Sequence, residues 1–341
     1  MATIKDVARL AQVGVGTASR VISGNGSVAK ETAERVRKAI DALEFRPSHA
    51  ARSLLSGSSK MIGVYLPVLK GTFYTPILQT IDTELRSSGL HMMVAFGVGE
   101  GDARQQAQQG IDFLLERGCD GLLVFSNALD DADFESLGPR RGNLVVLNRH
   151  YPSVSEQCFI ADHHRGGVLA ARSLLKFGHQ TFAVIGGPST SPDNVDRLSG
   201  FMEELQRQGI DTSKVRTVHS DFSTKGGWDS TQTLMASGSK FTALFCANDE
   251  MAVGALSYLQ QAGIKVPQII SVIGYDNTDS AEYSAPRLTS IQVPWREITL
   301  NGLYWLMNHC YGTQNPIKRE FRISVSWRAS VAPPRLARRK G

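Results

Sequence analysis

The amino-acid sequence predicts an α/β protein in which a small all-helical head precedes a larger core built on parallel sheets. From residue 61 onward, short apolar runs alternate with amphipathic helical stretches, which is typical of parallel sheets covered on both faces. The first 60 residues instead favour short helices joined by tight turns. The 341 residues, 42% hydrophobic and 20% charged, are enough for two or three globular domains.

The head is predicted to form a helix-turn-helix. Thr3 can cap a first helix, with Asp6 completing a capping box. The apolar face of that helix comprises Ile4, Val7, Ala8 and Ala11. A second helix is expected over residues 15–23 and a third over 30–43, separated by a loop of turn-forming residues. Two short helices around a tight turn, closed by a third, form this motif.

Such a motif places its second helix in the major groove of DNA. The residues available to contact bases and phosphates are then Val15, Gly16, Thr17, Ser19 and Arg20. Residues 1–60 carry ten Lys and Arg against five Asp and Glu, whereas residues 61–334 carry 23 against 27. This imbalance indicates a polyanionic partner for the head. A structural three-helix bundle with a solubilising surface is the alternative.

A short helix is expected between Pro47 and Gly57, because proline suits a helix start and glycine its end. A helix this short is marginal on its own in water, so it needs a partner such as DNA or a second copy of the chain. Leu54 could then wedge between base steps in the minor groove. Alternatively, the segment is a plain linker whose leucines pack on the core.

The core is predicted to contain two lobes, because it is long for one sheet. Strands are expected over residues 61–66, 91–96, 121–125, 144–147, 182–185, 242–246 and 270–273. Helices are expected over residues 77–87, 103–117, 167–177, 197–208 and 250–261.

Ligands in such folds bind at the carboxyl ends of strands, so the residues there define a candidate site. Arg197 is expected to open a helix, and Asp276 to follow the strand over 270–273. The residues at these ends are Phe73, Tyr74, Asn148, Arg149, Asp162, His163, Arg197, Phe222, Asn248, Asp249, Tyr275, Asp276 and Asn277. A guanidinium, carboxylate and amide groups, and aromatic rings together suit a polyhydroxylated ligand. The alternative for the Asp and Asn residues is a role as helix caps.

Several classes of protein are disfavoured. No apolar run approaches the roughly 18 residues that span a bilayer, and the N-terminus lacks a signal-peptide core. The four cysteines lie far apart, which favours free thiols in a reducing cytoplasm. Residues 97–101 form only part of a dinucleotide-binding loop, and the pair His163 and His164 lacks a third metal ligand. We therefore expect no cofactor, no metal and no catalytic activity.

Motifs along essentially the whole chain resemble those of the LacI/GalR (lactose- and galactose-repressor) family of transcription regulators. In the head these are Thr3-Ile4-Lys5-Asp6-Val7-Ala8, Thr17-Ala18-Ser19-Arg20-Val21-Ile22, Phe45-Arg46-Pro47 and Ala51-Arg52-Ser53-Leu54. In the core they are Ala247-Asn248-Asp249-Glu250-Met251-Ala252, Ser271-Val272-Ile273-Gly274-Tyr275-Asp276-Asn277, Pro286-Arg287-Leu288-Thr289-Ser290 and Arg328-Ala329-Ser330-Val331-Ala332-Pro333-Pro334.

The resemblance implies a homodimeric regulator in the bacterial cytoplasm, associated with the nucleoid, whose DNA-binding head recognises a pseudo-palindromic operator. It implies a helix-turn-helix over residues 1–46, a hinge helix and linker over 47–60, and a basic tail over 335–341. The core, 61–334, resembles a periplasmic sugar-binding protein, with one lobe over 61–161 plus 291–323 and the other over 162–290 plus 324–334. DNA contacts would come from Thr3, Val15, Gly16, Thr17, Ser19, Arg20, Ala51 and the minor-groove lever Leu54. The effector would contact Phe73, Asn148, Arg197, Phe222, Asn248 and Asp276.

By resemblance, the function expected is allosteric repression of carbohydrate-utilisation genes, released by a sugar inducer. A purine or phosphorylated metabolite acting as corepressor is the nearest alternative. A sugar-binding transport protein would lack the basic head, and a carbohydrate enzyme would need paired carboxylates such as Asp249 and Asp276.

The chain departs from the family pattern at a few positions. Gly14 and Ala29 stand where the family usually has capping hydroxyl residues, and Ala29 costs its helix about 1 kcal/mol. No leucine heptads follow Pro334 in this sequence, so we expect no tetramer-forming tail of the kind that some members have.

Replacing Leu54 with alanine is expected to weaken specific DNA binding far more than non-specific binding, because only the specific complex uses the minor-groove wedge. A competition titration with unrelated duplex DNA measures both affinities. Equal losses of specific and non-specific affinity would contradict the role of Leu54 as a minor-groove wedge.

Overall fold

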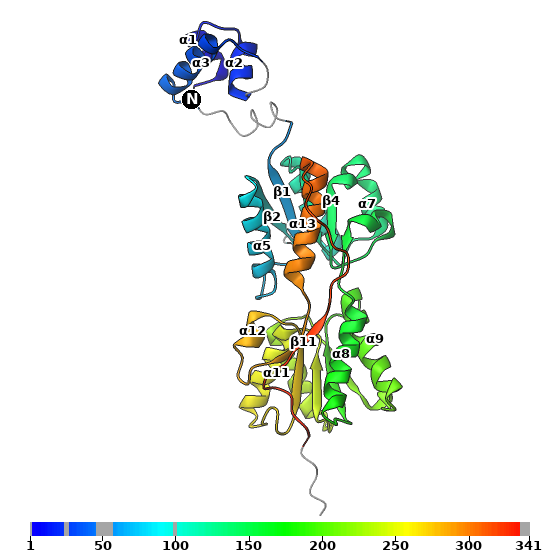
Figure 1. The fold of residues 1–341 in the computed structure, drawn as a ribbon. Coiled ribbons are helices and arrows are strands. Elements are labelled where there is room, and N and C mark those ends of the chain that lie inside the picture. Colours follow the sequence, from blue (N-terminus) through cyan, green and yellow to red (C-terminus); the bar gives the residue numbers. More distant parts are fainter. Residues whose placement is uncertain (1, 24–26, 46–56, 98–100, 335–341) are drawn as a thin grey trace, which may run out of the picture.

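The computed structural model describes residues 2–23, 27–45, 57–97 and 101–334. The head contains α1 (Ile4–Leu10), α2 (Val15–Ser23) and α3 (Lys30–Ala42), as Figure 1 shows. Thr3 and Asp6 form the predicted capping box. Six buried side chains form the core of the head: Val7, Ala8, Ala11, Ala18, Val36 and Ala39. Val21, Ile22, Ile40 and Leu43 are half-buried.

The first lobe is a five-stranded sheet with the order β2-β1-β3-β4-β5, and each neighbouring pair is parallel. Its strands are β1 (Met61–Leu66), β2 (His91–Phe96), β3 (Gly121–Phe125), β4 (Leu144–Leu147) and β5 (Cys158–Phe159). Its helices are α5 (Tyr74–Ser87), α6 (Ala103–Glu116), α7 (Asp131–Ser136), α13 (Trp295–Tyr311) and the 3-10 segments η1 (Gly138–Asn143) and η2 (Pro152–Gln157). The first four strands have the predicted bounds because each is a continuous apolar run.

The second lobe is a six-stranded sheet with the order β11-β10-β9-β8-β6-β7, and β11 is antiparallel to β10. Its strands are β6 (Phe182–Gly186), β7 (Arg216–His219), β8 (Ala243–Cys246), β9 (Ser271–Asp276), β10 (Thr289–Gln292) and β11 (Ser324–Ser326). Its helices are α8 (His163–Lys176), α9 (Pro192–Arg207), α10 (Thr224–Ala236), α11 (Asp249–Gln261), α12 (Asp279–Glu282) and the 3-10 segment η3 (Thr212–Lys214).

Several predicted element ends in the second lobe are wrong. α9 begins at Pro192, which suits the first turn of a helix, so Arg197 lies in the second turn and does not open the helix. α8 begins at His163, four residues before the predicted start, because the Asp162 side chain caps it by accepting from the Arg165 N–H. β9 continues to Asp276, which therefore lies at the end of the strand and not beyond it.

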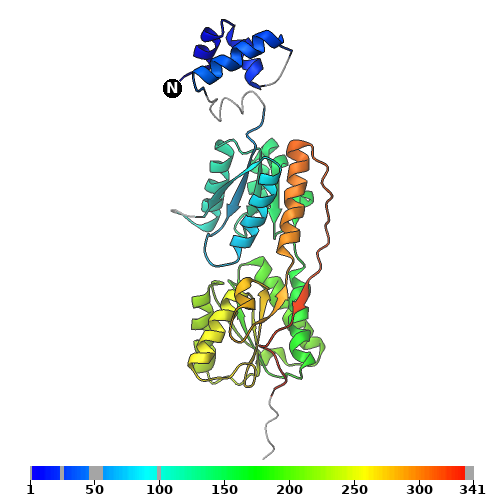
Figure 2. The same cartoon turned by 60° about the vertical axis from the view of Figure 1, so that its left-hand side comes forward.

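The chain crosses between the lobes after β5, after β10 and again between α13 and β11. The crossing after β10 falls at residues 293–294, two residues later than expected, because β10 pairs with β9 as far as Gln292. Figure 2 shows α13 lying along the first lobe, with the returning segment beside it. One buried apolar cluster includes side chains of both lobes, among them Leu147, Phe245 and Trp295.

The four cysteines are free thiols, two of them (Cys158 and Cys246) buried and two half-buried. Among the described helices, none is both long enough and apolar enough to cross a membrane.

Replacing Ala29 with serine is expected to stabilise α3, because this helix starts without a side-chain cap. The serine hydroxyl can accept from an N–H in the first turn, at a gain of about 1 kcal/mol. Hydrogen exchange at Glu31 and Thr32 in the full chain measures this gain. Ala42→Ser, at the other end of α3, is the matched control and should leave these amides unchanged. Exchange that is unaltered in Ala29→Ser would contradict the prediction.

Candidate functional site

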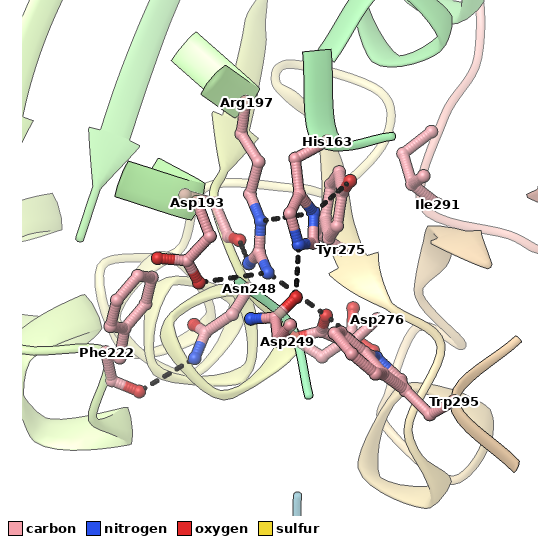
Figure 3. Close-up of polar contacts among 12 residues, drawn as sticks. His163, Asp193, Arg197, Phe222, Asn248, Asp249, Tyr275, Asp276, Ile291 and Trp295 are labelled. Atoms are coloured by element: carbon pink, nitrogen blue, oxygen red, sulfur yellow. Dashed lines mark hydrogen bonds and ion pairs between the residues drawn. The ribbon is translucent and has the colours of Figure 1, made fainter. Parts of the chain in front are cut away.

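The carboxyl ends of strands from both sheets meet between the two lobes, and the predicted ligand-contacting residues lie there. Phe73 precedes α5, Asn148 follows β4, and Asp276 ends β9. Phe222 precedes α10, and Asn248 caps α11 by accepting from the Met251 N–H. Figure 3 shows His163, Asp193, Tyr275 and Asp276 gathered around Arg197. We call the set Asn127, Asn148, His163, Asp193, Arg197, Tyr275, Asp276 and Trp295 the interlobe cluster.

Arg197 is the centre of the interlobe cluster and is only 3% exposed. Its Nη2 lies 3.4 Å from Oδ2 of Asp193 and 3.6 Å from Oδ1 of Asp276. Its Nη1 donates to the carbonyl oxygen of Ala247 at 2.6 Å, and the guanidinium lies 4.1 Å from the ring centroid of Tyr275. Burial opposes the charge, but the carboxylates of Asp276 and Asp193 hold the pKa of Arg197 above its usual value.

Asp193 belongs to the interlobe cluster, although its place there was not predicted from the sequence. Its carboxylate accepts from the Ser191 hydroxyl and from Nδ2 of Asn127, which lies just after β3 in the first lobe. Burial raises the pKa of Asp193, but Arg197 and Ser191 lower it by more, so its net pKa is below the usual value. The missed signal was its spacing: Asp193 precedes Arg197 by four residues on one helix, which places both side chains on one face.

Burial raises the pKa of Asp276 to about 6, although Arg197 and the Trp295 indole favour the carboxylate. The indole Nε1 donates to Oδ1 of Asp276 at 3.2 Å. Trp295 also brings Phe73 to the interlobe cluster, since their ring centroids are 5.2 Å apart in an edge-to-face arrangement. Trp295 was not predicted, because it lies at a crossing between the lobes and not at a strand end.

His163 joins the two lobes within the interlobe cluster. Its Nδ1 lies 2.9 Å from the Tyr275 hydroxyl and 3.4 Å from Nε of Arg197. Because Nε of an arginine only donates, Nδ1 is the acceptor, and Nε2 carries the proton that it donates to Oδ1 of Asn148 at 2.6 Å. Burial, assisted by the charge of Arg197, lowers the pKa of His163 to about 3.

His163 therefore serves as a hydrogen-bonding residue. Its neighbour His164 points to the surface and pairs with Glu203 at 2.9 Å. Within the described residues, no group of three or more His, Cys, Asp or Glu side chains could hold a metal ion.

Several polar contacts between described residues bridge the lobes around Arg197. They include those of Asn127 with Asp193 at 3.0 Å and of Asn148 with His163 at 2.6 Å. They also include those of Trp295 with Asp276 at 3.2 Å and of the Thr72 N–H with Glu250 at 2.6 Å. The Glu250 carboxylate approaches so closely that a Cβ at Gly71 would lie 2.1 Å from its Oε1.

The remaining predicted residues of the second lobe also lie beside Arg197. The Phe222 ring centroid is 6.0 Å from the guanidinium, and Nδ2 of Asn248 donates to the Phe222 carbonyl oxygen at 2.9 Å. Asp249 is fully buried and accepts from the Thr278 N–H at 2.7 Å and the Ser290 hydroxyl at 2.6 Å. Asp249 therefore secures the local fold, so it does not form the catalytic pair with Asp276 that a carbohydrate enzyme would need.

In the head, the predicted DNA-contacting residues of α2 lie on or near its surface. Val15 is 44% exposed, Gly16 and Arg20 are exposed, and Thr17 and Ser19 are half-buried. The Thr3 hydroxyl donates to Asp6 at 2.7 Å as part of the helix cap. Ala51 and Leu54 lie outside the described residues.

Residues 3–48 match the family model of bacterial regulatory proteins, lacI family, and residues 171–331 match the periplasmic binding protein-like domain. The chain is 30% identical to the HTH-type transcriptional regulator AscG of Escherichia coli (strain K12), over 87% of this chain and 89% of AscG. It is 31% identical to the transcriptional regulator GalR of the same organism, over 86% of this chain and 85% of GalR.

Among solved structures, the lac repressor dimer bound to operator and the anti-inducer ONPF superimposes with a TM-score of 0.82 at 27% identity. The match covers 97% of this chain and 99% of that one. These similarities define a DNA-binding transcriptional regulator and not an enzyme. The chain belongs to the LacI family of bacterial regulatory proteins.

Replacing His163 with glutamine is expected to flatten the dependence of stability on pH. Between pH 6.5 and about 3, the unfolded chain binds a proton at His163 that the native ring does not. This histidine therefore lowers the stability of the wild type as pH falls through that window, by roughly 2 kcal/mol at pH 5. Urea denaturation of both proteins at pH 8 and pH 5 tests this. A difference in stability that is the same at both pH values would argue against it.

Proposed function

We propose that this protein represses carbohydrate-utilisation genes and is released from its operator by a small neutral sugar bound at the interlobe cluster. It acts as a homodimer in the bacterial cytoplasm. Residues 1–46 bind DNA through the exposed side of α2, residues 47–60 form the hinge, and residues 61–334 bind the effector and dimerise.

The balance of charge around Arg197 carries the proposal for a neutral ligand. The guanidinium already faces two buried carboxylates, those of Asp193 and Asp276, at 3.4 and 3.6 Å. A phosphate or carboxylate group entering here would meet more negative than positive charge, which is unfavourable in a buried site. A sugar hydroxyl can instead donate to a carboxylate and accept from the guanidinium.

The rings of Phe73, Trp295 and Phe222 complete the case for a sugar. They flank the polar groups, and such rings pack against the apolar faces of sugars. Two relatives support this choice by their own names. The ribose operon repressor of Haemophilus influenzae is 32% identical over 302 residues, and a CelR–cellobiose complex superimposes with a TM-score of 0.68 at 26% identity.

A purine corepressor is the second candidate. Phe222 favours it, because this residue has a left-handed backbone conformation (φ 64°) that holds its ring beside Arg197. A flat base could stack on that ring. The two carboxylates beside Arg197 disfavour a phosphorylated ligand.

The bridging contacts supply a reason for the ligand to change the arrangement of the lobes. Asp193 is bonded to Asn127 of the first lobe, and Asp276 is bonded to Trp295. A ligand that hydrogen-bonds to these carboxylates must displace Asn127 and Trp295. Its affinity for the protein therefore differs between lobe arrangements. That difference is what a ligand needs in order to shift a two-state equilibrium. We infer that the shift separates the hinge segments and withdraws Leu54 from DNA.

A thermal-shift screen of the full chain tests the effector class. The panel holds ribose, galactose, cellobiose, their phosphorylated counterparts, adenine and guanine. A ligand present at one hundred times its Kd stabilises the native state by about 2.7 kcal/mol. We expect a neutral sugar to stabilise the protein. A response to a purine or a phosphorylated compound alone would contradict the proposal.

Two variants of α9 identify where the ligand binds. Asp193→Asn should reduce the shift given by the stabilising sugar, because the carboxylate accepts from sugar hydroxyls. Asp196→Asn changes an exposed carboxylate on the same helix and should leave the shift unaltered. Equal shifts in both variants would place the ligand elsewhere.

A further inference from the structure

Asp120 anchors the segment through which the chain enters the core. It lies just before β3, and its carboxylate receives five hydrogen bonds. Oδ1 accepts from the N–H and the hydroxyl of Ser59 at 2.8 and 3.0 Å. Oδ2 accepts from the Ser58 hydroxyl at 2.6 Å and the Lys60 N–H at 2.8 Å. The fifth donor is the Tyr311 hydroxyl, which reaches Oδ2 at 2.9 Å.

These donors stabilise the ionised form of the Asp120 side chain. Burial opposes the charge, but the hydrogen bonds from Ser58, Ser59 and Tyr311 hold the pKa of Asp120 below its usual value. Residues 58–60 lead directly into β1 from the head side of the chain. Asp120 therefore fixes the direction in which the chain leaves the core toward the head.

A single helix joins this anchor to the interlobe cluster. α13 starts with Trp295, whose indole donates to Asp276, and ends with Tyr311, whose hydroxyl donates to Asp120. The helix has 17 residues and is therefore about 25 Å long. Figure 1 shows it running the length of the first lobe, from the boundary between the lobes toward the side of β1 that faces the head.

α13 packs closely against the backbone next to Asp120. A Cβ at Gly121, the residue after Asp120, would lie 2.8 Å from both Leu306 and Cys310 of this helix. The Cys310 thiol also contacts the carbonyl oxygen of Asp120 at 3.3 Å. Because close-packed groups transmit displacement, a shift of α13 along the sheet must move Asp120 as well.

We propose that α13 couples the interlobe cluster to residues 58–60. At one end of the helix, Trp295 shifts when the arrangement of the lobes changes. At the other end, the hydrogen bond from Tyr311 to Asp120 passes this shift on to residues 58–60. Tyr311 and Asp120 are positioning residues, which act on DNA binding through the linker. Helix shifts of about 1–2 Å are sufficient for such transitions. The proposal rests on the interlobe cluster being the effector site of the proposed function.

Hydrogen exchange of the full chain, with no ligand added, tests the coupling. The probe is the set of amides at residues 59–61. Tyr311→Phe removes one donor to Asp120 and should speed their exchange about fivefold. Trp295→Phe removes the hydrogen bond to Asp276 at the other end of α13, about 25 Å from Tyr311. It should also speed the exchange of the amides at residues 59–61. The double variant should exchange no faster than Tyr311→Phe alone, because the two changes act through one element.

Tyr304→Phe is the matched control. It removes a hydroxyl from the same helix, one that is bonded to Glu84 and not to Asp120. It should leave residues 59–61 unchanged, and the amides of β8 should be unchanged in every variant if the fold is intact. Unaltered exchange at residues 59–61 in Tyr311→Phe would contradict the role of the Tyr311–Asp120 bond in holding this segment. Unaltered exchange in Trp295→Phe, or additive effects in the double variant, would overturn the coupling.

Because this experiment uses no effector, its outcome is independent of whether the effector is a sugar. If no sugar stabilises the protein but Trp295→Phe still speeds exchange at residues 59–61, the proposed ligand is wrong and the coupling through α13 is supported. A successful screen with uncoupled exchange would do the reverse.

Discussion

The buried guanidinium of Arg197 is the constraint on which the site depends. A charge this far from water is costly unless it is paired, and removing one partner of such a pair typically costs about 3–5 kcal/mol. Three parts of the second lobe meet this demand: α9 supplies Asp193, β9 supplies Asp276, and the residue after β8 supplies the carbonyl oxygen of Ala247. Asp276 adopts a left-handed conformation (φ 97°), which is uncommon for a residue other than glycine. Such strain tends to persist where a site requires it.

The same pairing explains how a ligand could act on the lobes. The polar side chains of the interlobe cluster are hydrogen-bonded to protein groups, and several of those bonds cross between the lobes, as with Asn127 and Asp193 or Asn148 and His163. Binding therefore means exchange of partners, and each exchanged bond changes how one lobe holds the other. A site whose polar groups were all satisfied within one lobe would bind a ligand without this consequence. Under the proposed function, the bridging contacts are what would let ligand binding change the arrangement of the lobes.

Much of the fold could be predicted from sequence, and the reasons for the misses are physical. β1 to β4 are uninterrupted apolar runs, so their pattern identified them with the observed ends. β7 is an edge strand with half-exposed and exposed residues, and its pattern carries no such signal. α13 is buried on several sides, so it lacks the polar face by which a helix is recognised. Asn148 and Asp276 of the interlobe cluster could be identified from their positions at strand ends, but Asp193 and Trp295 join the cluster through contacts that only the tertiary structure brings about.

Under the proposed function, a ligand at the interlobe cluster and DNA at the head compete through the arrangement of the lobes. Thermodynamic linkage makes this reciprocal: a ligand that weakens DNA binding must itself bind more weakly to the DNA complex. The most direct measurement is calorimetric titration of the most stabilising sugar from the screen into the full chain, free and bound to a duplex selected from a random library by this protein. We expect the Kd for the sugar to be at least about fivefold higher in the presence of the duplex, in line with typical coupling energies. Equal Kd values with and without DNA would contradict it.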